Sequence, residues 1–287
     1  MAPSAHQEQL YNQLVASLSS EEILTKWSEV TPLKSISGVP TSSSSSNDET
    51  QGLFEGHDQE QIKLMEELCI VLDYNDTPIG AGTKKLCHIM DNINQGLLHR
   101  AFSVFLFNEK NELLLQQRAD EKITFPAMWT NTCCSHPLCI KSEMGISKEN
   151  ENASALEQAI DGAKIAAQRK LDHELGIPLR DCEYANFQYL TRIHYKSASG
   201  DESSKWGEHE IDYILILKSE NPSVNANPNE VKDYKYVNQE QLKQMFKDES
   251  LVFTPWFKLI CETFLFNWWN NLDNLNSFQD DKIHRML

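Results

Sequence analysis

The sequence predicts an α+β fold in which a mixed β-sheet is sandwiched between helices. Two β-rich runs joined by "NEKN" predict a hairpin over residues 99–118, and "EIDYILILK" predicts a second strong strand at 210–218. Apolar residues recur at helical spacing over 155–175. Strands and helices mix without strict alternation, which favours a mixed sheet flanked by helices. The chain has 287 residues, 40% of them hydrophobic, enough for one sizeable core or two small ones.

The other elements follow from turn and cap residues. Gly176, with Pro178 just beyond it, ends the long helix, because glycine readily adopts the left-handed conformation that closes a helix. Asn238 can cap a helix that follows a strand. The remaining predictions are a short helix and a strand within 61–85, a strand and a helix within 230–246, and an apolar C-terminal helix at 254–272 that must pack on the body.

The first sixty residues form a separate region in this prediction. Spaced apolar residues indicate a weak helix near the start of the chain: Leu10, Leu14, Leu18 and Ile23. The Ser-rich stretch at 35–52 is too polar to bury the apolar area that ordering requires. We therefore expect residues 1–60 to be a mobile or loosely docked extension, and residues 61–287 to form the main folded domain with its C-terminal helix.

Composition argues against several kinds of partner and location. Lys and Arg number 26 against 42 Asp and Glu, a formal net charge of −16, so no nucleic-acid partner is expected. The sequence contains no run of about 18 apolar residues, so no membrane span is predicted. Its first thirty residues show no basic start followed by an apolar block, so no secretory signal is predicted. Seven scattered cysteines indicate reduced thiols and a cytoplasmic protein. The ending "HRML" loosely resembles a peroxisomal address, which makes the peroxisome a second expected location.

A pair of glutamates suggests a cation site. In "WGEHEIDYILILK", alternate strand residues share a face, so Glu208 and Glu210 point together with Asp212 next in line. His209 faces the other way. Two carboxylates about 7 Å apart at the mouth of a buried strand repel each other, and a cation beside them removes that cost. A solvated strand end is the other interpretation of this pattern.

Three histidines extend the candidate site. His88 and His99 flank a polar loop and can converge at the start of the hairpin, and His136 lies in "TNTCCSHP". Three imidazoles and two carboxylates suit zinc, manganese or iron in five- or six-coordinate geometry. Cys134 would then lie near the ion, which would favour its thiolate form. Taken alone, each histidine also fits a surface or half-buried position, and the stretch also fits a redox pair or simple packing.

Other residues suit a phosphorylated ligand. Glu174, on the last turns of the long helix, can hold a hard cation such as Mg²⁺. Lys84, Arg118 and Lys122 are basic residues in acidic surroundings and can bind phosphate. Trp256 follows a proline at the start of the C-terminal helix, where its π face can meet a cation. A solvated helix end, surface charges and a core tryptophan are the alternative interpretations.

Together these motifs resemble the type I isopentenyl-diphosphate isomerases, and the fungal members in particular. The matching elements occur in the family's order: "LLHRAFSVF", "NTCCSHP", "RKLDHELGIP", "WGEHEID", "FTPWF" and the ending "HRML". The likeness covers roughly residues 56–287. It implies a Nudix-like fold and an isomerase that interconverts isopentenyl and dimethylallyl diphosphate in isoprenoid and sterol biosynthesis.

The resemblance also implies roles for individual residues. Cys134 and Glu210 match the catalytic cysteine and glutamate, assisted by Tyr195, and Trp256 matches the aromatic residue that faces the reacting carbon. The implied ligands of a Zn²⁺ or Mn²⁺ ion are His88, His99, His136, Glu208 and Glu210. The implied contacts of the substrate's diphosphate and its Mg²⁺ are Lys84, Arg118, Lys122 and Glu174. The expected partner is thus a small diphosphate, bound by a monomer or weak homodimer.

One departure from the Nudix hydrolases concerns their G-x5-E-x7-R-E-U-x-E-E-x-G-U box, where U is aliphatic. Aligned on Arg169, three acidic positions of the box are not glutamate and its leading glycine is absent. The residues at the box positions are Ala155, Asp161, Lys170, Leu171, His173, Glu174, Gly176 and Ile177. This pattern argues against hydrolysis.

Three rival functions remain open at this point. The first is a Nudix hydrolase of a nucleoside diphosphate derivative, which would release phosphate or nucleotide. The second is a non-catalytic, zinc-stabilised domain, which chelators would unfold. The third is a thiol hydrolase using Cys134 and His136, for which no partner that orients the histidine is evident.

Overall fold

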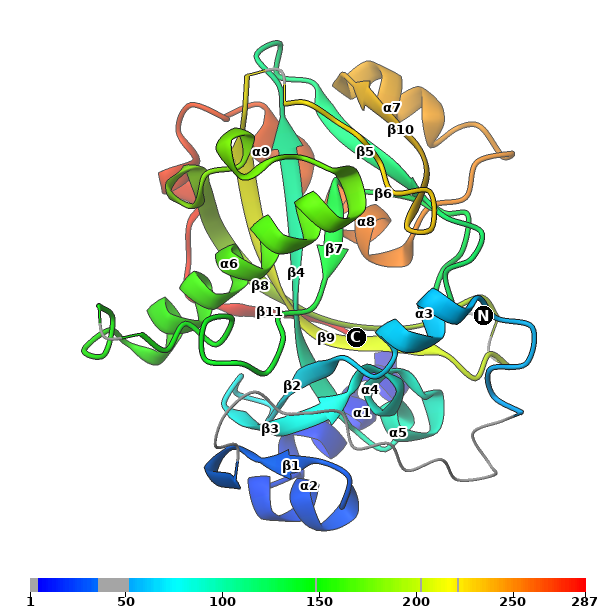
Figure 1. Cartoon of the computed structure of the whole chain (residues 1–287), viewed down its shortest axis with the longest axis vertical. Helices are drawn as coiled ribbons and strands as arrows, with labels where there is room; N and C mark the ends of the chain where they lie inside the picture. The colour runs from blue at the N-terminus through cyan, green and yellow to red at the C-terminus, as the bar shows by residue number, and fades with distance from the viewer. Residues whose placement is uncertain (1–4, 36–51, 148, 202, 221) are drawn as a thin grey trace.

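The structure is a computed structural model that describes residues 5–35, 52–147, 149–201, 203–220 and 222–287. Its centre is a large mixed β-sheet (Figure 1). The main path of the sheet comprises, in chain order, β1 (Thr31–Pro32), β2 (Leu68–Leu72), β3 (Pro78–Thr83), β4 (Leu98–Phe107), β8 (Phe187–Ala198), β9 (Gly207–Lys218) and β11 (Ile283–Met286). Beside this path lie β5 (Leu113–Arg118), β6 (Trp129–Thr130), β7 (Cys133–Ser135) and β10 (Val231–Val237). Along the path the spatial order is β1-β3-β2-β4-β9-β8-β11.

Strand β4 is the hub of the sheet. One of its edges pairs in parallel with β9, with His99 opposite Glu210. Its other edge pairs with β2, β7 and β5, all antiparallel. In the β7 pairing, Cys134 lies opposite Ser103. Three segments that are far apart in sequence therefore meet on neighbouring strands.

Alternating side chains of the sheet divide the core into two layers. Phe102 and Val104 of β4 pack in one layer with the alanine-rich face of α6 (Ala155–Leu175). Phe105 and Phe107 pack in the other layer with α8 (Pro255–Ile260) and α9 (Phe266–Trp269). Helices thus cover both faces of the sheet, as Figure 1 shows, which confirms the α+β arrangement predicted from the sequence.

Capping residues set the ends of the long helix α6. The Ser154 hydroxyl accepts from the Glu157 N–H, and the Glu157 carboxylate accepts from the Ser154 N–H, forming a capping box. Gly176 closes the helix at φ 59°, where a Cβ would lie 2.3 Å from the Asn225 carbonyl oxygen. Only glycine fits this left-handed and crowded position. The predicted helix and its predicted end are both confirmed.

The remaining helices are short, and side chains cap four of those described. Ser19 caps α2, Asp58 caps α3, Thr83 caps α4, and Asn238 caps α7 as the sequence predicted. The bounds are α1 (Ala5–Ser17), α2 (Ser20–Lys26), α3 (Gln59–Leu64), α4 (Lys84–His88), α5 (Met90–Asn94) and α7 (Gln239–Met245). Short 3-10 turns lie at Leu33–Ser35, Leu179–Asp181, Tyr184–Asn186 and Leu275–Phe278. Within the described residues, no helix has the length and apolar character that crossing a membrane requires.

Three features depart in detail from the sequence prediction. The hairpin at 99–118 forms, but β5 pairs with β4 only at Leu113 opposite Phe107 and then runs along β10. A π-helical turn at Cys261–Leu265 joins α8 to α9 within the predicted C-terminal helix. Strands β8 and β11 were not predicted, and β11 exists only through its parallel pairing with β8.

The described part of the N-terminal region packs against the body of the protein. Val15, Ile23, Trp27 and Val30 are each less than 5% exposed. The Trp27 indole N–H donates to Asn92 Oδ1 at 3.1 Å. This packing is closer than a loosely docked extension implies, and much of the Ser-rich stretch lies outside the described residues. The boundary at residue 60 stays a prediction.

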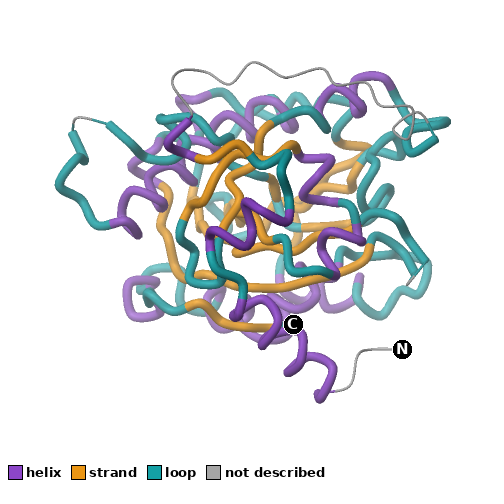
Figure 2. The backbone as a smooth tube through the Cα atoms, turned by 90° about the horizontal axis from the view of Figure 1, so that it is seen from below, coloured by secondary structure: helices purple, strands orange, loops and turns teal. Residues whose placement is uncertain are grey.

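Both ends of the described chain reach the same side of the sheet (Figure 2). Tyr74 links them, because its hydroxyl donates to Asn12 Oδ1 at 3.2 Å and its carbonyl accepts from the Arg285 guanidinium at 2.5 Å. Between these segments, His194 and His209 lie with their Nε2 atoms 2.8 Å apart. His209 therefore faces away from the two glutamates that flank it in sequence, as predicted.

Candidate active site and metal centre

Five predicted ligands converge on one point. The side chains of His88, His99, His136, Glu208 and Glu210 each offer one ligand atom, and these atoms all lie within 4.8 Å of one another. They come from α4, β4, the segment after β7, and β9. The convergence follows from the sheet, because β4 and β7 are neighbours and β4 lies beside β9. The sequence motifs therefore belong to a single site.

Close contacts join the two carboxylates to the three rings. Glu208 Oε2 lies 2.8 Å from His88 Nε2, and Glu210 Oε1 lies 2.7 Å from His136 Nε2. His99 Nε2 lies between them, 3.8 Å from Glu208 Oε2 and 3.4 Å from Glu210 Oε1. All five residues are buried.

The donor set fits a divalent cation. His88 Nε2, His99 Nε2 and Glu208 Oε2 are buried and have no hydrogen-bond partner of good geometry among the described residues. Burial lowers the pKa of His88 to about 4, so its ring is neutral at pH 7, the form that binds metal. Its other ring nitrogen lies 2.6 Å from the Lys84 carbonyl, which orients the ring. A divalent ion would satisfy the orphaned atoms and offset the two buried carboxylates.

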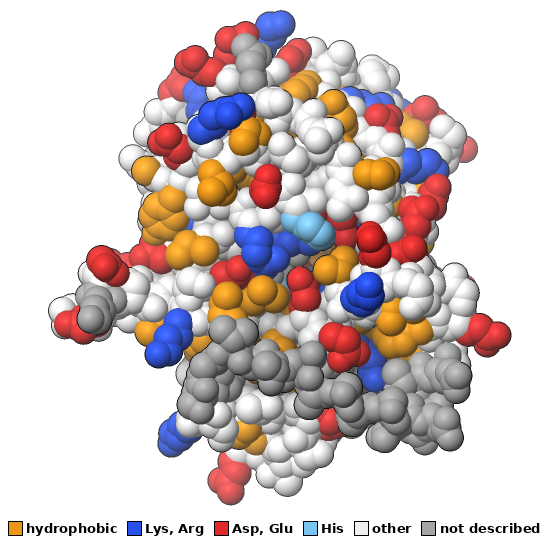
Figure 3. Space-filling model, viewed as in Figure 1, with side chains coloured by type: hydrophobic (Ala, Val, Ile, Leu, Met, Phe, Trp, Pro, Cys, Tyr) orange, Lys and Arg blue, Asp and Glu red, His pale blue; other side chains and the backbone are white. Residues whose placement is uncertain are grey.

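A narrow pocket opens beside this cluster. It brings together most of the predicted residues. The lining comprises Lys84, Arg118, Lys122, Thr124, Cys134, Ser135, His136, Glu174, Glu208, Glu210 and Trp256. Figure 3 shows basic side chains and a histidine gathered near the middle of one face, on a surface that is otherwise rich in acidic side chains.

The two adjacent cysteines point to opposite faces of the sheet. Cys133 is fully buried in the layer of α6, where its Sγ lies 3.6 Å from Glu174 Oε2. Cys134 is half-buried, lines the pocket, and packs against the layer that contains Trp256. Burial, with the charges of Asp212 and Glu210, raises the pKa of the Cys134 thiol well above its usual range when no metal is bound. The thiol form therefore predominates at neutral pH in this state.

Glu210 and Trp256 are both held by neighbouring polar groups. The Tyr195 hydroxyl donates to Glu210 Oε2 at 2.6 Å. Trp256 is 1% exposed, and its indole N–H donates to Asn131 Oδ1 at 3.1 Å. The edge of Phe125 contacts its ring, with centroids 5.0 Å apart. Trp256 is thus a core residue that also lines the pocket. That its π face meets a cation stays a prediction.

The basic wall of the pocket is built around one loop. Arg118 donates to the carbonyls of Thr124 and Phe125 and so shapes the loop that carries Lys122. Phe125 has φ 49°, a strained value for a bulky residue, which this support and the buried ring maintain. Lys122 pairs with Glu230 at 2.5 Å. Lys84, at the start of α4, completes the wall.

Glu174 lines the pocket from the last turn of α6. Its Oε1 is 3.1 Å from Lys170 Nζ, and its Oε2 accepts from Gln116 Nε2 at 2.9 Å. Gln116 also donates to the Thr132 carbonyl, so the amide is fixed by strand β5 and the segment before β7. Of the predicted site residues, His88, His99 and Tyr195 lie behind the pocket lining.

Sequence reasoning missed several supporting residues. Ser103 donates to the buried carboxylate of Asp212 at 2.8 Å, beside Cys134. Asn131 orients Trp256, and Glu230 pairs with Lys122. The sequence placed Asp212 next in line on the strand face of the two glutamates. Its partner, Ser103, comes beside it only through the pairing of β4 with β9. No local motif marks Asn131 or Glu230.

Comparison with known proteins agrees with this geometry. A NUDIX domain model matches residues 97–257, more than half of the chain. The fold and the site therefore define a protein of the Nudix class.

Within that class, the chain belongs to the isopentenyl-diphosphate delta-isomerase family. It is 70% identical to isopentenyl-diphosphate delta-isomerase of Candida albicans over 281 residues, which cover 96% of this chain and 99% of that protein. It is 58% identical to the Schizosaccharomyces pombe enzyme of the same name, over 80% of this chain and 95% of that protein. A crystal structure of a Nudix hydrolase from Alicyclobacillus acidocaldarius covers 63% of this chain and 96% of its own, at 9% identity and TM-score 0.44, too slight a likeness to carry an argument.

Proposed function

We propose that this site isomerises isopentenyl diphosphate to dimethylallyl diphosphate, and back, with Cys134 and Glu210 as its acid–base pair. The observation that carries the proposal is one pocket whose lining includes both Cys134, Glu210 and Trp256 and the basic residues Lys84, Arg118 and Lys122. Family membership makes the isomerase activity that of this chain. The roles of the individual residues are tested by substitution.

The reaction dictates what such a site needs. An unactivated alkene has no carbonyl to stabilise a carbanion, so protonation must come first and gives a tertiary carbocation. A base then removes a different proton, and the double bond has moved. The site must supply an acid, a base, stabilisation of positive charge and exclusion of water.

Cys134 and Glu210 would share the proton transfers. Cys134 sits on β7 and Glu210 on β9, on opposite sides of β4, and both line the pocket. A substrate between them would meet a thiol on one side and a carboxyl group on the other. Their roles exchange between the two directions of the reaction. The Tyr195 hydroxyl donates to Glu210 Oε2 and so holds this carboxyl group in place.

Trp256 is suited to stabilise the cation. An indole face attracts a positive charge by about 2 kcal/mol or more when the site is dry. Its burial, together with that of Tyr195 and Phe125, leaves little room for water around the reacting carbon. Dryness also protects the carbocation from capture by water.

Two metal ions fit the residues present. His88, His99, His136, Glu208 and Glu210 would hold a Zn²⁺ or Mn²⁺ ion, and Glu174 would help to hold Mg²⁺ on the diphosphate. When bound, these ions supply positive charge that favours the ionised carboxylate of Glu210 and neutralises phosphate oxygens. Lys84, Arg118 and Lys122 would donate hydrogen bonds to the diphosphate.

The metabolic role of the enzyme follows from its substrate and product. The substrate and product are building blocks of isoprenoids, so we infer a role in isoprenoid and sterol biosynthesis. We also infer a cytoplasmic enzyme, with the peroxisome as a second location, that works as a monomer or weak homodimer.

The direct test is incubation of the purified protein with isopentenyl diphosphate and Mg²⁺, followed by product analysis. Appearance of the allylic isomer without phosphate release is expected. Release of phosphate in place of the isomer would point to a hydrolase and contradict the proposal.

A further inference from the structure

Glu230 is a buried carboxylate that the proposed chemistry does not use. It is 2% exposed and ends the turn at 227–230, directly before β10. The turn is fastened to α6, because the Asn227 N–H donates to the Glu174 carbonyl at 2.9 Å. The Glu230 carbonyl accepts from the Ala119 N–H at 3.0 Å, at the start of the loop that carries Lys122. The backbone therefore fixes Glu230 between the helix and the basic loop.

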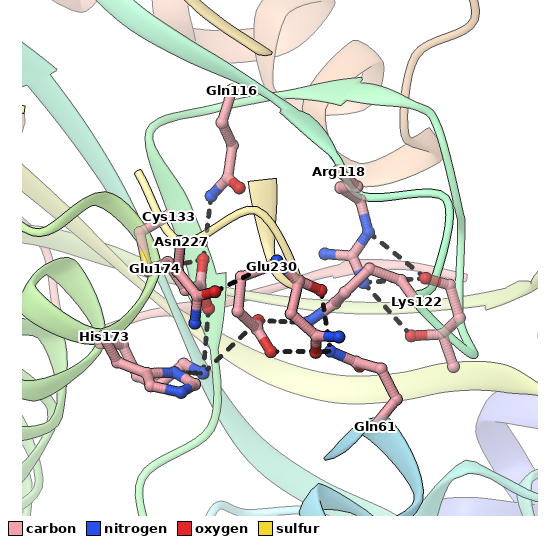
Figure 4. A network of polar contacts seen from close by, with 12 residues as sticks. Gln61, Gln116, Arg118, Lys122, Cys133, His173, Glu174, Asn227 and Glu230 are labelled. Carbon is pink, nitrogen blue, oxygen red and sulfur yellow. Dashed lines mark hydrogen bonds and ion pairs between the residues drawn. The ribbon is translucent and has the colours of Figure 1, made fainter. Parts of the chain in front are cut away.

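The carboxylate of Glu230 lies between two labelled side chains in Figure 4. Its Oε2 accepts from Lys122 Nζ at 2.5 Å, and its Oε1 accepts from Gln61 Nε2 at 2.9 Å. Lys170 Nζ lies 3.9 Å from Glu230 Oε2 and 3.1 Å from Glu174 Oε1. Each lysine thus has its own nearest carboxylate: Lys122 has Glu230, and Lys170 has Glu174.

Charge balance explains why this division matters. A buried ammonium that lacks a partner either finds another carboxylate or loses its proton. Glu174 also lines the pocket, and its charge acts on Lys122. If Lys122 turned to Glu174, a second lysine would join Lys170 on the carboxylate proposed to help hold Mg²⁺. The Lys122–Glu230 pair prevents this.

A second contact ties Glu230 to helix α3. Gln61 is 3% exposed, and its amide also donates to the Asn229 carbonyl at 3.0 Å and to Asn229 Oδ1 at 2.8 Å. The Asn229 amide in turn donates to Asp58, the residue that caps α3, at 3.0 Å. The carboxylate is therefore fixed from both sides and cannot follow Lys122 if the lysine moves.

We propose that Glu230 is a positioning residue for the diphosphate: it holds the ammonium of Lys122 in the pocket wall and keeps it from adding to the contacts that Glu174 already makes with Lys170 and Gln116. This rests on the proposed function, since it assumes that Lys122 and Glu174 serve the diphosphate and its Mg²⁺. It predicts that Glu230 governs the binding of diphosphate and Mg²⁺ while the proton transfers by Cys134 and Glu210 continue.

The test compares Glu230→Gln with the wild type in two assays. Calorimetric titration with inorganic pyrophosphate, at several Mg²⁺ concentrations, should show affinity about 10–100-fold weaker and a higher Mg²⁺ requirement. Turnover of isopentenyl diphosphate should show a raised KM and a much smaller change in kcat. Glu230→Asp, which keeps the charge, should recover part of the affinity. Asp120→Asn is the matched control, because Asp120 forms an exposed ion pair with Lys232 near the same loop and should change neither assay.

A double-mutant cycle separates positioning from simple stabilisation. If Glu230 acts through Lys122, Glu230→Gln should weaken pyrophosphate binding far less in a Lys122→Met background than in the wild type. Additive effects, or unchanged pyrophosphate affinity in folded Glu230→Gln, would overturn the proposal. Should Glu230→Gln fail to fold, Glu230→Asp with Lys122→Met carries the same cycle, with the same two readings. Failure of the wild type itself to isomerise the substrate would instead sink the proposed function.

Discussion

Tyr195 and Glu210 face each other across strands β8 and β9 and are joined by a hydrogen bond of 2.6 Å. They are partners in the strand register, so the backbone sets their separation before any ligand binds. The other oxygen of Glu210 lies 2.7 Å from His136 Nε2. One carboxyl group thus links a phenol to the metal-ligand cluster, and its orientation is determined from both sides.

Tyr195→Phe should lower kcat by about 10–100-fold, because Glu210 loses the partner that orients it. KM and metal content should change little, since Tyr195 does not line the pocket and is not a predicted ligand. Steady-state kinetics and elemental analysis of the purified variant measure both quantities. Wild-type turnover in a folded Tyr195→Phe protein would remove Tyr195 from the mechanism.

Cys134→Ala should reduce turnover by at least about 10²–10⁴-fold, the usual contribution of a positioned proton-transfer group. Its fold and metal content should stay intact, because Cys134 is only half-buried. Cys139→Ala is the matched control: Cys139 is a fully buried thiol of the same segment, so its loss should lower the melting temperature but spare turnover. Full activity of Cys134→Ala would refute the assignment.

Metal removal should abolish turnover reversibly and destabilise the protein. Without a cation, Glu208 and Glu210 are two buried carboxylates whose negative charges repel each other. Returning Zn²⁺ or Mn²⁺ at 100 times its dissociation constant should raise the free energy of unfolding by about 2.7 kcal/mol.

Glu208→Gln should weaken binding of the Zn²⁺ or Mn²⁺ ion. Elemental analysis measures the metal content, and thermal melts measure the loss of stabilisation. Glu240→Gln, which alters an exposed ion pair with Lys243, is the control. Equal metal content in Glu208→Gln and the wild type would exclude Glu208 as a ligand.

Trp256→Phe should lower kcat more than it raises KM, because phenylalanine keeps much of the packing and attracts a cation less strongly than indole does. Trp256→Ala should add a loss of stability of about 3–5 kcal/mol, as expected for a buried aromatic residue. Kinetics and chemical denaturation of both variants separate the two effects. If the Phe variant changes only stability, Trp256 is a core residue without a catalytic role.

Pyrophosphate affinity should fall as the pH rises above about 8. Burial lowers the pKa of Lys122 to about 8, with Arg118 and Lys84 acting in the same direction and Glu230 and Glu174 opposing them. Below this pH the ammonium is present, and above it the proton is lost and a donor to phosphate disappears. Lys122→Arg keeps its charge throughout, so its affinity should decline less over the same range. Parallel pH profiles for the two proteins would show that Lys122 does not titrate there.

Local signals predicted much of the fold and the chemistry of the site. Gly176 and the helical spacing before it marked α6, and the Glu208/Glu210 spacing marked a shared strand face. Strand β11 escaped prediction because its four residues are ordered by pairing with β8, and nothing in "IHRM" encodes that partner. Residues 5–35 pack more closely than their weak periodicity suggested, because Trp27 finds its partner, Asn92, in a distant segment.

Supporting residues of the site escaped prediction for the same reason. Asn131, Ser103 and Glu230 act on partners that are 108 to 125 residues away. Their positions depend on which strands become neighbours. Residue type and spacing can identify a ligand set, but they cannot identify the side chains that orient it.

The parallel pairing of β11 with β8 bears on how proteolytic trimming affects the enzyme. Met286 lies opposite Tyr195, and Arg285 approaches His194 on the strand that supports β9. Removal of residues 283–286 would leave this edge of β8 without its partner strand. We therefore expect turnover to fall, although β11 contributes no side chain to the pocket lining.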